Sequence, residues 1–512
     1  MSDEPSPAAV WVRGRPLLGT HAGELGAGEP VELRCRGGRI VERRRAGRGP
    51  LPGLIGSCET ILAPTLTDSH AHLMAAAARR VRFDAGPEAA PELSKLLSLL
   101  ARMAQASPGE GWLVAAGFDE ALIPEQRPPT LREIDATVGQ RALRVRHATR
   151  HASLFSSAAL ARIEAAGLGY GLEVVAPGSA LFFERQPVLT RLIPGPEGEA
   201  LMAALRTLAQ DWLRGGIAHI DDLTASNDAG RVAFLAQARR RGVLPQSLRA
   251  WLGDADEFEG AQRAAQGTLT LAGVKILAHD EATVRAPAFV DAVRRARRRG
   301  LPVAIHAAAA DVTDAVLDVL EQVPPTSGAG AAPDRIEHAF LCPPALAARL
   351  RRAGVWVVVQ PGFLEARARK YEHELEPALW PWLQPLRSLG LAGVPLAAGS
   401  DAPVGPGGAA VGLRGAITRG PRDGRSVFGP AEVLAPAVAL ELWARPFASS
   451  RRVDGGLGEP RPGDVADMAL LERLPSAVNG FEFEAPTVIL GGRVLDCGPQ
   501  PEPAHESPRP FC

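Results

Sequence analysis

The chain has 512 residues, of which 46% are hydrophobic and 22% charged, a composition typical of a globular enzyme. Its formal net charge is zero, so no overall field favours a nucleic-acid partner or an anionic membrane surface. We find no apolar stretch of membrane-spanning length and no secretory signal at the N-terminus. The five cysteines are scattered and odd in number, which indicates reduced thiols and a cytoplasmic location.

The first informative element in chain order is the short apolar run 62–73, which ends in His70-Ala-His72. On a β-strand, side chains at positions i and i+2 point to the same face. Two imidazoles on one face can bind one metal ion, since neutral imidazole nitrogen is a common zinc ligand. The alternative is a pair of polar histidines in a loop that follows a strand.

The middle of the chain repeats one local pattern, in which a helical stretch ends in arginine and glycine and an apolar strand follows. The copies lie at 213–220, 238–245, 296–306 and 350–359, with a weaker copy at 389–398. The glycine suits the left-handed position just past a helix, and the arginines complement the negative end of the helix dipole. Strands that alternate with helices predict βαβ units and a parallel sheet.

Counting strands predicts an α/β fold with a (β/α)8 TIM-type barrel. The eight candidates are 61–67, 217–221, 244–251, 268–277, 303–306, 336–338, 355–360 and 395–399. In this fold the chemistry lies at the C-terminal ends of the strands. Polar residues stand at six such positions, which are His70, His72, Lys275, His306, His338 and Asp401. The sequence therefore predicts that all six meet at one rim of the barrel.

Lys275 lies in the largely apolar run 268–277, where an unpaired ammonium would be costly to bury. Desolvation lowers a lysine pKa and frees the neutral amine. A neutral amine reacts with carbon dioxide to give a carbamate, which is an anionic oxygen ligand. The alternative is a lysine that snorkels to solvent or pairs with an acid.

The order His-x-His, Lys, His, His, Asp resembles the binuclear metal pattern of the amidohydrolase superfamily. Further segments resemble its amidohydrolase-3 (YtcJ-like) branch. These segments are 112–119, 128–135, 151–160, 273–276, 359–361, 399–404, 462–471 and 488–495. The resemblance thus extends over most of the chain.

The resemblance implies a small β-sandwich domain built from both chain termini beside the barrel. We expect residues 1–62 to form its N-terminal part, and 455–512 its C-terminal part and tail. The barrel then spans 63–454, with an insertion at about 74–212. Short strands expected near turns fit this domain, at 9–12, 31–34, 466–471 and 487–494.

The resemblance also implies a metal-dependent amidohydrolase that acts on carbon–nitrogen bonds other than peptide bonds. One ion would take His70, His72 and Asp401, a second would take His306 and His338, and carbamylated Lys275 would bridge them. One or two zinc ions are expected, with manganese, iron or nickel as alternatives. A metal-bound hydroxide would attack an amide-type bond, and Asp401 would shuttle the proton.

Two departures from the branch concern the substrate pocket. The branch commonly continues from the lysine to Asp-Gly, whereas this chain has His279-Asp280, and Thr149-Arg150 replaces Asp-Gly before His151. The residues expected to contact the substrate are Arg150, His151, His279 and Gln360. Asp68 or Ser69 can orient the first histidines, with strand capping as the alternative. We expect a small-molecule substrate, no nucleic-acid or membrane partner, and a homodimer.

Three alternatives stay open at this point. A deaminase or a lactone or ester hydrolase can use the same fold, and a non-catalytic barrel relative is the third. Deaminases of this superfamily often use a single ion and lack the bridging lysine, so Lys275 weighs against the first. Non-catalytic relatives usually lose ligands, whereas this chain has all six. The ligands alone do not identify the substrate.

Overall fold

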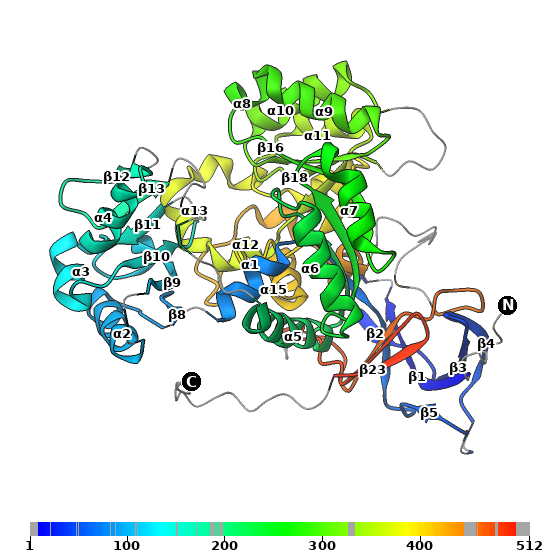
Figure 1. Cartoon of the computed structure of the whole chain (residues 1–512). Coiled ribbons are helices and arrows are strands. Elements are labelled where there is room, and N and C mark those ends of the chain that lie inside the picture. Colours follow the sequence, from blue (N-terminus) through cyan, green and yellow to red (C-terminus); the bar gives the residue numbers. More distant parts are fainter. Residues whose placement is uncertain are drawn as a thin grey trace. The chain divides into compact units, whose positions relative to one another are not determined.

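The computed structural model (Figure 1) describes most of the chain and separates it into two compact units. The described residues are 9–20, 22–47, 49, 51–81, 83–87, 89–107, 109, 111–149, 152–169, 172–184, 189, 192–193, 198–325, 333–444, 457, 459–476 and 480–497. One unit comprises Met1–Leu73 and Arg206–Gln500, and the other contains Met74–Leu205. In the described residues no helix combines the length and apolar character needed to cross a bilayer.

The first unit contains the predicted barrel, an eight-stranded parallel sheet. Its strands, in order around the sheet, are β7 (Leu66–Ala71), β14 (Ile217–Asp222), β15 (Ser247–Leu252), β16 (Thr270–Leu277), β17 (Val303–Ala307), β18 (Arg335–His338), β19 (Trp356–Val359) and β20 (Leu396–Ala398). Every neighbouring pair along this order is parallel. The barrel expected from the alternation of strands and helices is confirmed.

The barrel closes where the segment after β20 meets β7. The backbone N–H of Asp401 donates to the carbonyl of His70 at 2.6 Å, and that of His72 donates to the carbonyl of Ala402 at 2.9 Å. Gly399 makes this approach feasible, because a Cβ there would lie 2.4 Å from the His70 nitrogen. Closure therefore brings Asp401 beside the two histidines of the first strand.

Helices connect the strands, and they end as the sequence predicts. The α-helices of this unit beyond residue 197 are α5 (Gly198–Arg214), α6 (Ala229–Arg240), α7 (Phe258–Ala265), α8 (Glu281–Arg285), α9 (Pro287–Arg298), α10 (Ala310–Gln322), α11 (Pro344–Ala353), α12 (Gly362–Ala366), α13 (Ala368–Glu374), α14 (Leu386–Leu391), α15 (Ala409–Thr418) and α16 (Pro436–Ala444). Short 3-10 turns are η4 (Ala255–Glu257), η5 (Pro377–Trp382) and η6 (Pro430–Glu432).

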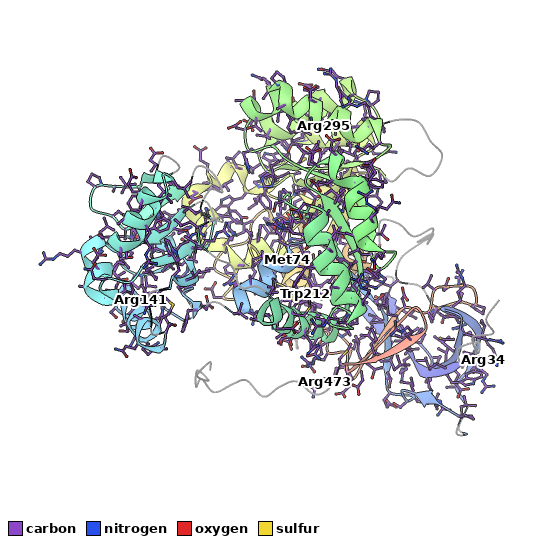
Figure 2. The ribbon with its side chains drawn as sticks, in the orientation of Figure 1. Arg34, Met74, Arg141, Trp212, Arg295 and Arg473 are labelled. Carbon is purple, nitrogen blue, oxygen red and sulfur yellow. The ribbon has the colours of Figure 1, made fainter. Side chains whose placement is uncertain are left out.

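The glycines that follow these helices adopt the left-handed backbone expected of them. Their φ angles are 80° at Gly216, 67° at Gly242 and Gly300, 66° at Gly354 and 77° at Gly393. The neighbouring arginines pair with surface carboxylates. Arg295 on α9, labelled in Figure 2, lies 3.2 Å from an Asp254 carboxylate oxygen.

Strands from both termini form a mixed sheet, as expected. They are β1 (Val10–Gly19), β2 (Leu25–Ala27), β3 (Val31–Arg36), β4 (Arg39–Arg45), β5 (Leu54–Ile55), β6 (Ile61–Pro64), β21 (Met468–Leu471), β22 (Thr487–Leu490) and β23 (Arg493–Asp496). N-terminal β6 pairs antiparallel with C-terminal β21. Leu33, Ile40, Met468 and Ile489 from the two chain ends share one core, so each terminus needs the other to bury its apolar face.

Two predicted strands are divided in the structure. The expected strand 61–67 is two strands, because β6 pairs with β21 in the terminal sheet and β7 belongs to the barrel. Pro64 lacks an amide hydrogen, which suits the end of a strand where the chain changes sheets. The expected strand 487–494 is a hairpin of β22 and β23, turned by Gly491 and Gly492 at φ 56° and 73°.

The second unit has its own sheet and core. Its strands, in spatial order, are β12 (Leu172–Val174), β13 (Leu181–Glu184), β11 (Ala152–Phe155), β10 (Leu143–His147), β9 (Leu113–Phe118) and β8 (Phe83–Asp84). Its helices are α2 (Leu93–Ala106), the 3-10 turn η1 (Glu120–Leu122), α3 (Leu131–Val138) and α4 (Ser157–Ala165), while α1 (Leu73–Arg80) begins at the unit boundary. Leu96, Leu100, Val145 and Leu154 lie in its core. The domain limits expected from the sequence stay predictions.

Candidate metal centre

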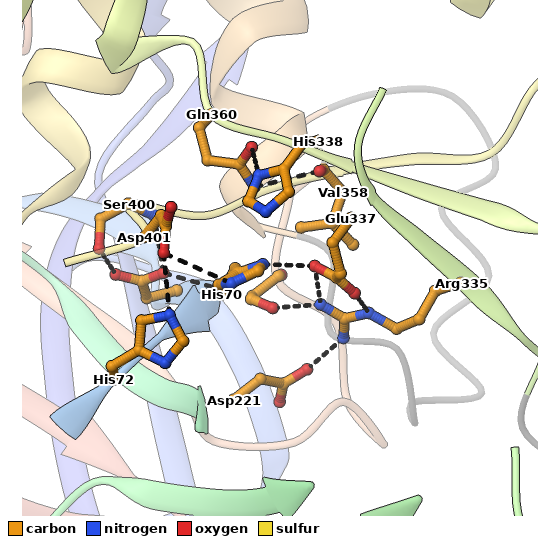
Figure 3. A network of polar contacts seen from close by, with 12 residues as sticks. His70, His72, Asp221, Arg335, Glu337, His338, Val358, Gln360, Ser400 and Asp401 are labelled. Atoms are coloured by element: carbon orange, nitrogen blue, oxygen red, sulfur yellow. Dashed lines mark hydrogen bonds and ion pairs between the residues drawn. The ribbon is translucent and has the colours of Figure 1, made fainter. Parts of the chain in front are cut away.

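Three predicted ligands meet at the closure of the barrel. One ligand atom from each of His70, His72 and Asp401 lies within 4.8 Å of the other two. Asp401 Oδ1 lies 3.0 Å from His72 Nε2 and 3.5 Å from His70 Nε2. The three side chains converge in Figure 3. Two imidazoles and a carboxylate at this spacing match the donor set of a divalent transition-metal site.

The backbone around these ligands is held by Asp68, which is buried on β7. Its carboxylate accepts from the Ser400 hydroxyl at 2.5 Å, from the Ser400 N–H at 2.9 Å and from the His70 N–H at 3.2 Å. Asp68 therefore joins β7 to the segment that follows β20, at the residues next to the candidate ligands. Asp401 itself adopts a φ of 54°, a left-handed conformation that is uncommon outside glycine and that often marks functional sites.

Two further predicted ligands, His306 and His338, lie beside this group. The His338 ring centroid is 4.9 Å from that of His70 and 4.4 Å from that of His306. His338 also has a left-handed backbone, with a φ of 83°, where β18 ends. His338 thus links His306 to the group around His70, although these three histidines come from strands that are far apart in the sequence.

Lys275 is the sixth predicted ligand, and its side chain is buried on β16. No hydrogen-bond partner for its Nζ is found among the described residues. Burial lowers the pKa of its ammonium to about 8, although the Glu337 and Asp401 carboxylates act in the opposite direction. The Lys275 amine is therefore buried, lacks a described hydrogen-bond partner and interacts electrostatically with the candidate ligand Asp401.

Burial also keeps His70 and His306 neutral. Burial, followed by the positive charge of Lys275, holds the pKa of His70 well below its usual range. Burial and the adjacent His338 lower the pKa of His306 to about 2. Burial alone would raise the pKa of Asp401, but the neighbouring His70 and His72 lower it to about 2. Neutral imidazole and ionised carboxylate are the protonation states that a metal ion requires.

A buried ion-pair network lies behind His70 (Figure 3). His70 Nδ1 lies 2.5 Å from Glu337 Oε2, within hydrogen-bond distance. Arg335 donates to both oxygens of Glu337 and to Asp221 Oδ2, the last at 2.7 Å. We did not predict Glu337 or Arg335 as site residues. The available signal was two charged side chains at 335 and 337, spaced for one face of an otherwise apolar strand.

His338 is held by amides instead of charges. Its Nδ1 lies 2.7 Å from Gln360 Oε1, while Gln360 Nε2 donates to the Val358 carbonyl at 3.1 Å. The Gln384 side-chain amide accepts a hydrogen bond from the Gln360 N–H and donates one to the Gln360 carbonyl. Arg419 in turn donates to the Gln384 carbonyl at 2.9 Å. Both ends of the Gln360 amide therefore contact the protein, and the predicted contact with substrate stays a prediction.

The remaining predicted substrate contacts are only partly described. His279 is exposed after β16, with its ring 5.4 Å from that of His306. Arg150 and His151 lie outside the described residues. A second group with metal-binding spacing, Asp119, Glu120 and His147, lies in the other unit and was not predicted.

The fold and this site define a barrel protein with a histidine and carboxylate cluster of metal-binding type at the C-terminal ends of its strands. A family model described as "Amidohydrolase family" (Amidohydro_3) matches residues 60–496, and the chain belongs to this family. The resemblance stated from the sequence motifs is confirmed.

Two named relatives are similar to the chain in sequence, and one solved structure is similar to it in fold. The chain is 23% identical over 488 residues to "Putative amidohydrolase YtcJ" of Bacillus subtilis (strain 168), covering 85% of this chain and 89% of the relative. It is 26% identical over 535 residues to "N-substituted formamide deformylase" of Arthrobacter pascens, covering 90% and 89%. An uncharacterized metal-dependent hydrolase from Pyrococcus horikoshii OT3 has a similar structure, with a TM-score of 0.66, 18% identity and coverage of 91% of this chain and 98% of that chain.

Proposed function

We propose that the chain is a metal-dependent hydrolase of amide-type carbon–nitrogen bonds. The observation that carries this proposal is the convergence of His70 Nε2, His72 Nε2 and Asp401 Oδ1, together with a buried Lys275 amine for which the described residues offer no hydrogen-bond partner. These residues fit a divalent ion, because the His70 imidazole is kept neutral and the Asp401 carboxylate is kept ionised. Zinc, which favours nitrogen and oxygen donors in this number, is the metal we expect.

A bound divalent ion supplies Lewis acidity and lowers the pKa of water, which makes a nucleophile available near neutral pH. The chain's own residues supply the rest. Asp401 is our candidate proton shuttle, since its ionised carboxylate can accept a proton and then deliver it to the leaving nitrogen. His306 and His338 are proposed as ligands of a second ion, so their nitrogens are not available as general bases.

Lys275 is proposed to bridge two ions after carbamylation. The neutral amine would attack the carbon of carbon dioxide, so that a nitrogen–carbon bond forms while one carbon–oxygen π bond breaks. One proton on the nitrogen would pass to water, which gives an anionic carbamate. A pKa of about 8 leaves an appreciable neutral fraction near neutral pH, as this reaction needs. The same residue argues against the single-ion deaminase alternative.

The proposed substrate class is N-acyl amines, with N-substituted formamides first among them. The support is a relative named for deformylation of such compounds, which covers 90% of this chain. The test uses the purified protein, stripped with a chelator and reloaded with zinc or manganese. We expect hydrolysis of N-alkyl or N-aryl formamides by the reloaded protein and none by the stripped protein. Hydrolysis of lactones or esters alone, or deamination alone, would contradict the amide proposal.

A further inference from the structure

Glu337 makes the closest described contact behind a predicted metal ligand. Its side chain is fully buried on β18, and its Oε2 lies 2.5 Å from His70 Nδ1. An ionised carboxylate only accepts hydrogen bonds, so the hydrogen in this contact belongs to Nδ1 of His70. The lone pair of the imidazole then lies on Nε2, the atom that is 3.5 Å from Asp401 Oδ1.

Glu337 is itself fixed by Arg335, two residues earlier on the same strand. The guanidinium donates from Nε to Glu337 Oε1 and from Nη2 to Oε2, the latter at 3.1 Å. Its Nη1 donates to Asp221 on β14 at 2.7 Å, and Asp221 also accepts two hydrogen bonds from Arg249 on β15, at 2.6 and 2.5 Å. Positive and negative groups alternate along this network, so each buried charge has an opposite neighbour.

The guanidinium also reaches the backbone of the first strand. Arg335 Nη2 donates to the carbonyl of Ser69, the residue before His70. Its guanidinium carbon lies 5.0 Å from the centre of the Trp251 ring. One cation therefore contacts both the backbone that carries His70 and the carboxylate that orients its ring.

Two other site histidines, His338 and His72, have neutral partners at the corresponding atom. His338 Nδ1 contacts the Gln360 amide oxygen at 2.7 Å, and His72 Nδ1 contacts the Thr224 hydroxyl at 3.3 Å. A carboxylate at Nδ1 increases the basicity of Nε2 more than a neutral oxygen does. Of these three histidines, His70 is the one whose Nδ1 contacts a carboxylate, so its Nε2 should be the most basic.

We propose that Glu337, held by Arg335, is the positioning residue of His70, fixing its Nδ1–H tautomer and the direction of Nε2. This role rests on the proposed function, in which His70 is a metal ligand. Glu337 touches neither substrate nor metal in this account, and it acts only through the imidazole. Its loss therefore weakens metal binding before it affects any chemical step.

The first test measures zinc affinity of the chelator-stripped protein by competition with a chromophoric chelator. Glu337→Gln should raise the zinc dissociation constant about tenfold to a hundredfold, since loss of an outer carboxylate partner typically has that effect. The matched control is Asp334→Asn. Asp334 is also buried and pairs with Arg297 at 2.8 Å, but it has no described contact with a site histidine.

Comparing the two variants separates positioning from general loss of stability. Both break a buried arginine–carboxylate pair and should lower Tm, but Asp334→Asn should change zinc affinity by less than about threefold, because the described side-chain contacts of Asp334 are with Arg297 and the Val303 N–H and not with a candidate ligand. Unchanged affinity in Glu337→Gln, or an equal loss in the control, would overturn the proposal.

The second test needs no variant of Glu337 to fold and no metal to bind. Nitrogen-15 NMR of the metal-free wild-type protein, with His70 identified by comparison with His70→Asn, reports which ring nitrogen carries the hydrogen. We expect protonated Nδ1 and unprotonated Nε2, and the opposite tautomer would overturn the proposal. A wild-type protein that binds no zinc would instead refute the proposed function, while this measurement still decides the role of Glu337.

Discussion

Asp401 Oδ1 lies 3.0 Å from His72 Nε2, although 329 residues separate the two in the sequence. The barrel closure creates this contact, because the Asp401 N–H donates to the carbonyl of His70 and the His72 N–H to that of Ala402. The same hydrogen bonds that complete the sheet thus assemble the candidate ligand cluster. A substitution that disrupts the closure of the barrel should therefore also disrupt the candidate metal site.

Gly399 provides a direct test of that link. Gly399→Ala places a methyl carbon only 2.4 Å from the His70 backbone nitrogen, well inside van der Waals contact, so the backbone must shift. We expect a lower Tm and loss of zinc binding. Gly390→Ala is the control, because Gly390 lies exposed in α14 with nothing within 4 Å of its ideal Cβ. It should leave zinc binding intact and keep or slightly raise Tm.

Asp401→Asn tests the proposed proton shuttle. The amide keeps the size of the side chain but cannot accept and return a proton, so kcat should fall about 10²- to 10⁴-fold. Steady-state kinetics with the best N-substituted formamide supply the measurement. Asp228→Asn is the control, since Asp228 caps α6 through the Arg231 N–H and asparagine caps equally well. Near-normal kcat in Asp401→Asn would remove this residue from the mechanism.

Lys275→Met tests whether the buried amine lowers the stability of the folded, metal-free protein. Burial lowers the pKa of Lys275 from 10.5 to about 8, so the ammonium destabilises the folded state fully below about pH 8. As the pH rises from 8 to 10.5 the folded state loses its proton first, and this penalty disappears.

In CO2-free buffer, Lys275→Met should therefore have a higher Tm than the wild type at pH 7, and the difference should shrink toward pH 10. Lys95→Met, at an exposed position on α2, should show no such pH-dependent difference. A lower Tm for Lys275→Met at pH 7 would indicate that the amine has a stabilising partner after all. When both proteins are loaded with zinc, Lys275→Met should have a lower Tm than the wild type, because the variant cannot form the carbamate that would hold the metal.

The buried thiols should resist alkylation. Burial raises the pKa of Cys35 and Cys497 to about 11 and that of Cys342 to about 12, so little thiolate exists at pH 8. Mass spectrometry after iodoacetamide treatment should find these three unmodified in the folded protein at pH 8 and modified in denaturant. Rapid modification of Cys342 in the folded protein would show that its environment is more open than the structure indicates.

Much of the barrel, and the placement of the candidate ligands at strand ends, could be predicted from local sequence patterns. Glycine after each helix and polar residues at strand ends are local signals, and Gly300, Gly354 and His338 stand where they predict. The division of 61–67 between two sheets was missed, because β6 pairs in the terminal sheet with β1 and with β21, which comes from the other end of the chain. No local pattern reveals which distant strand a residue will pair with.

The network behind His70 was missed for the same reason. Glu337 and His70 are 267 residues apart, and Asp221 and Arg335 are 114 apart. Their contacts exist only once the barrel strands stand side by side. Charged residues at alternate positions of a short apolar strand were the one local sign, since a buried charge needs a partner.

The central claim is that His70, His72 and Asp401 bind a divalent metal ion. The most direct measurement is the metal content of protein purified after growth with zinc, for the wild type and for the His70→Asn, His72→Asn double variant. We predict about one to two ions per chain in the folded wild type, as one-metal and two-metal sites require, and a loss of bound metal in the variant. A folded wild-type protein without stoichiometric metal, or a variant that retains all of it, would contradict the account.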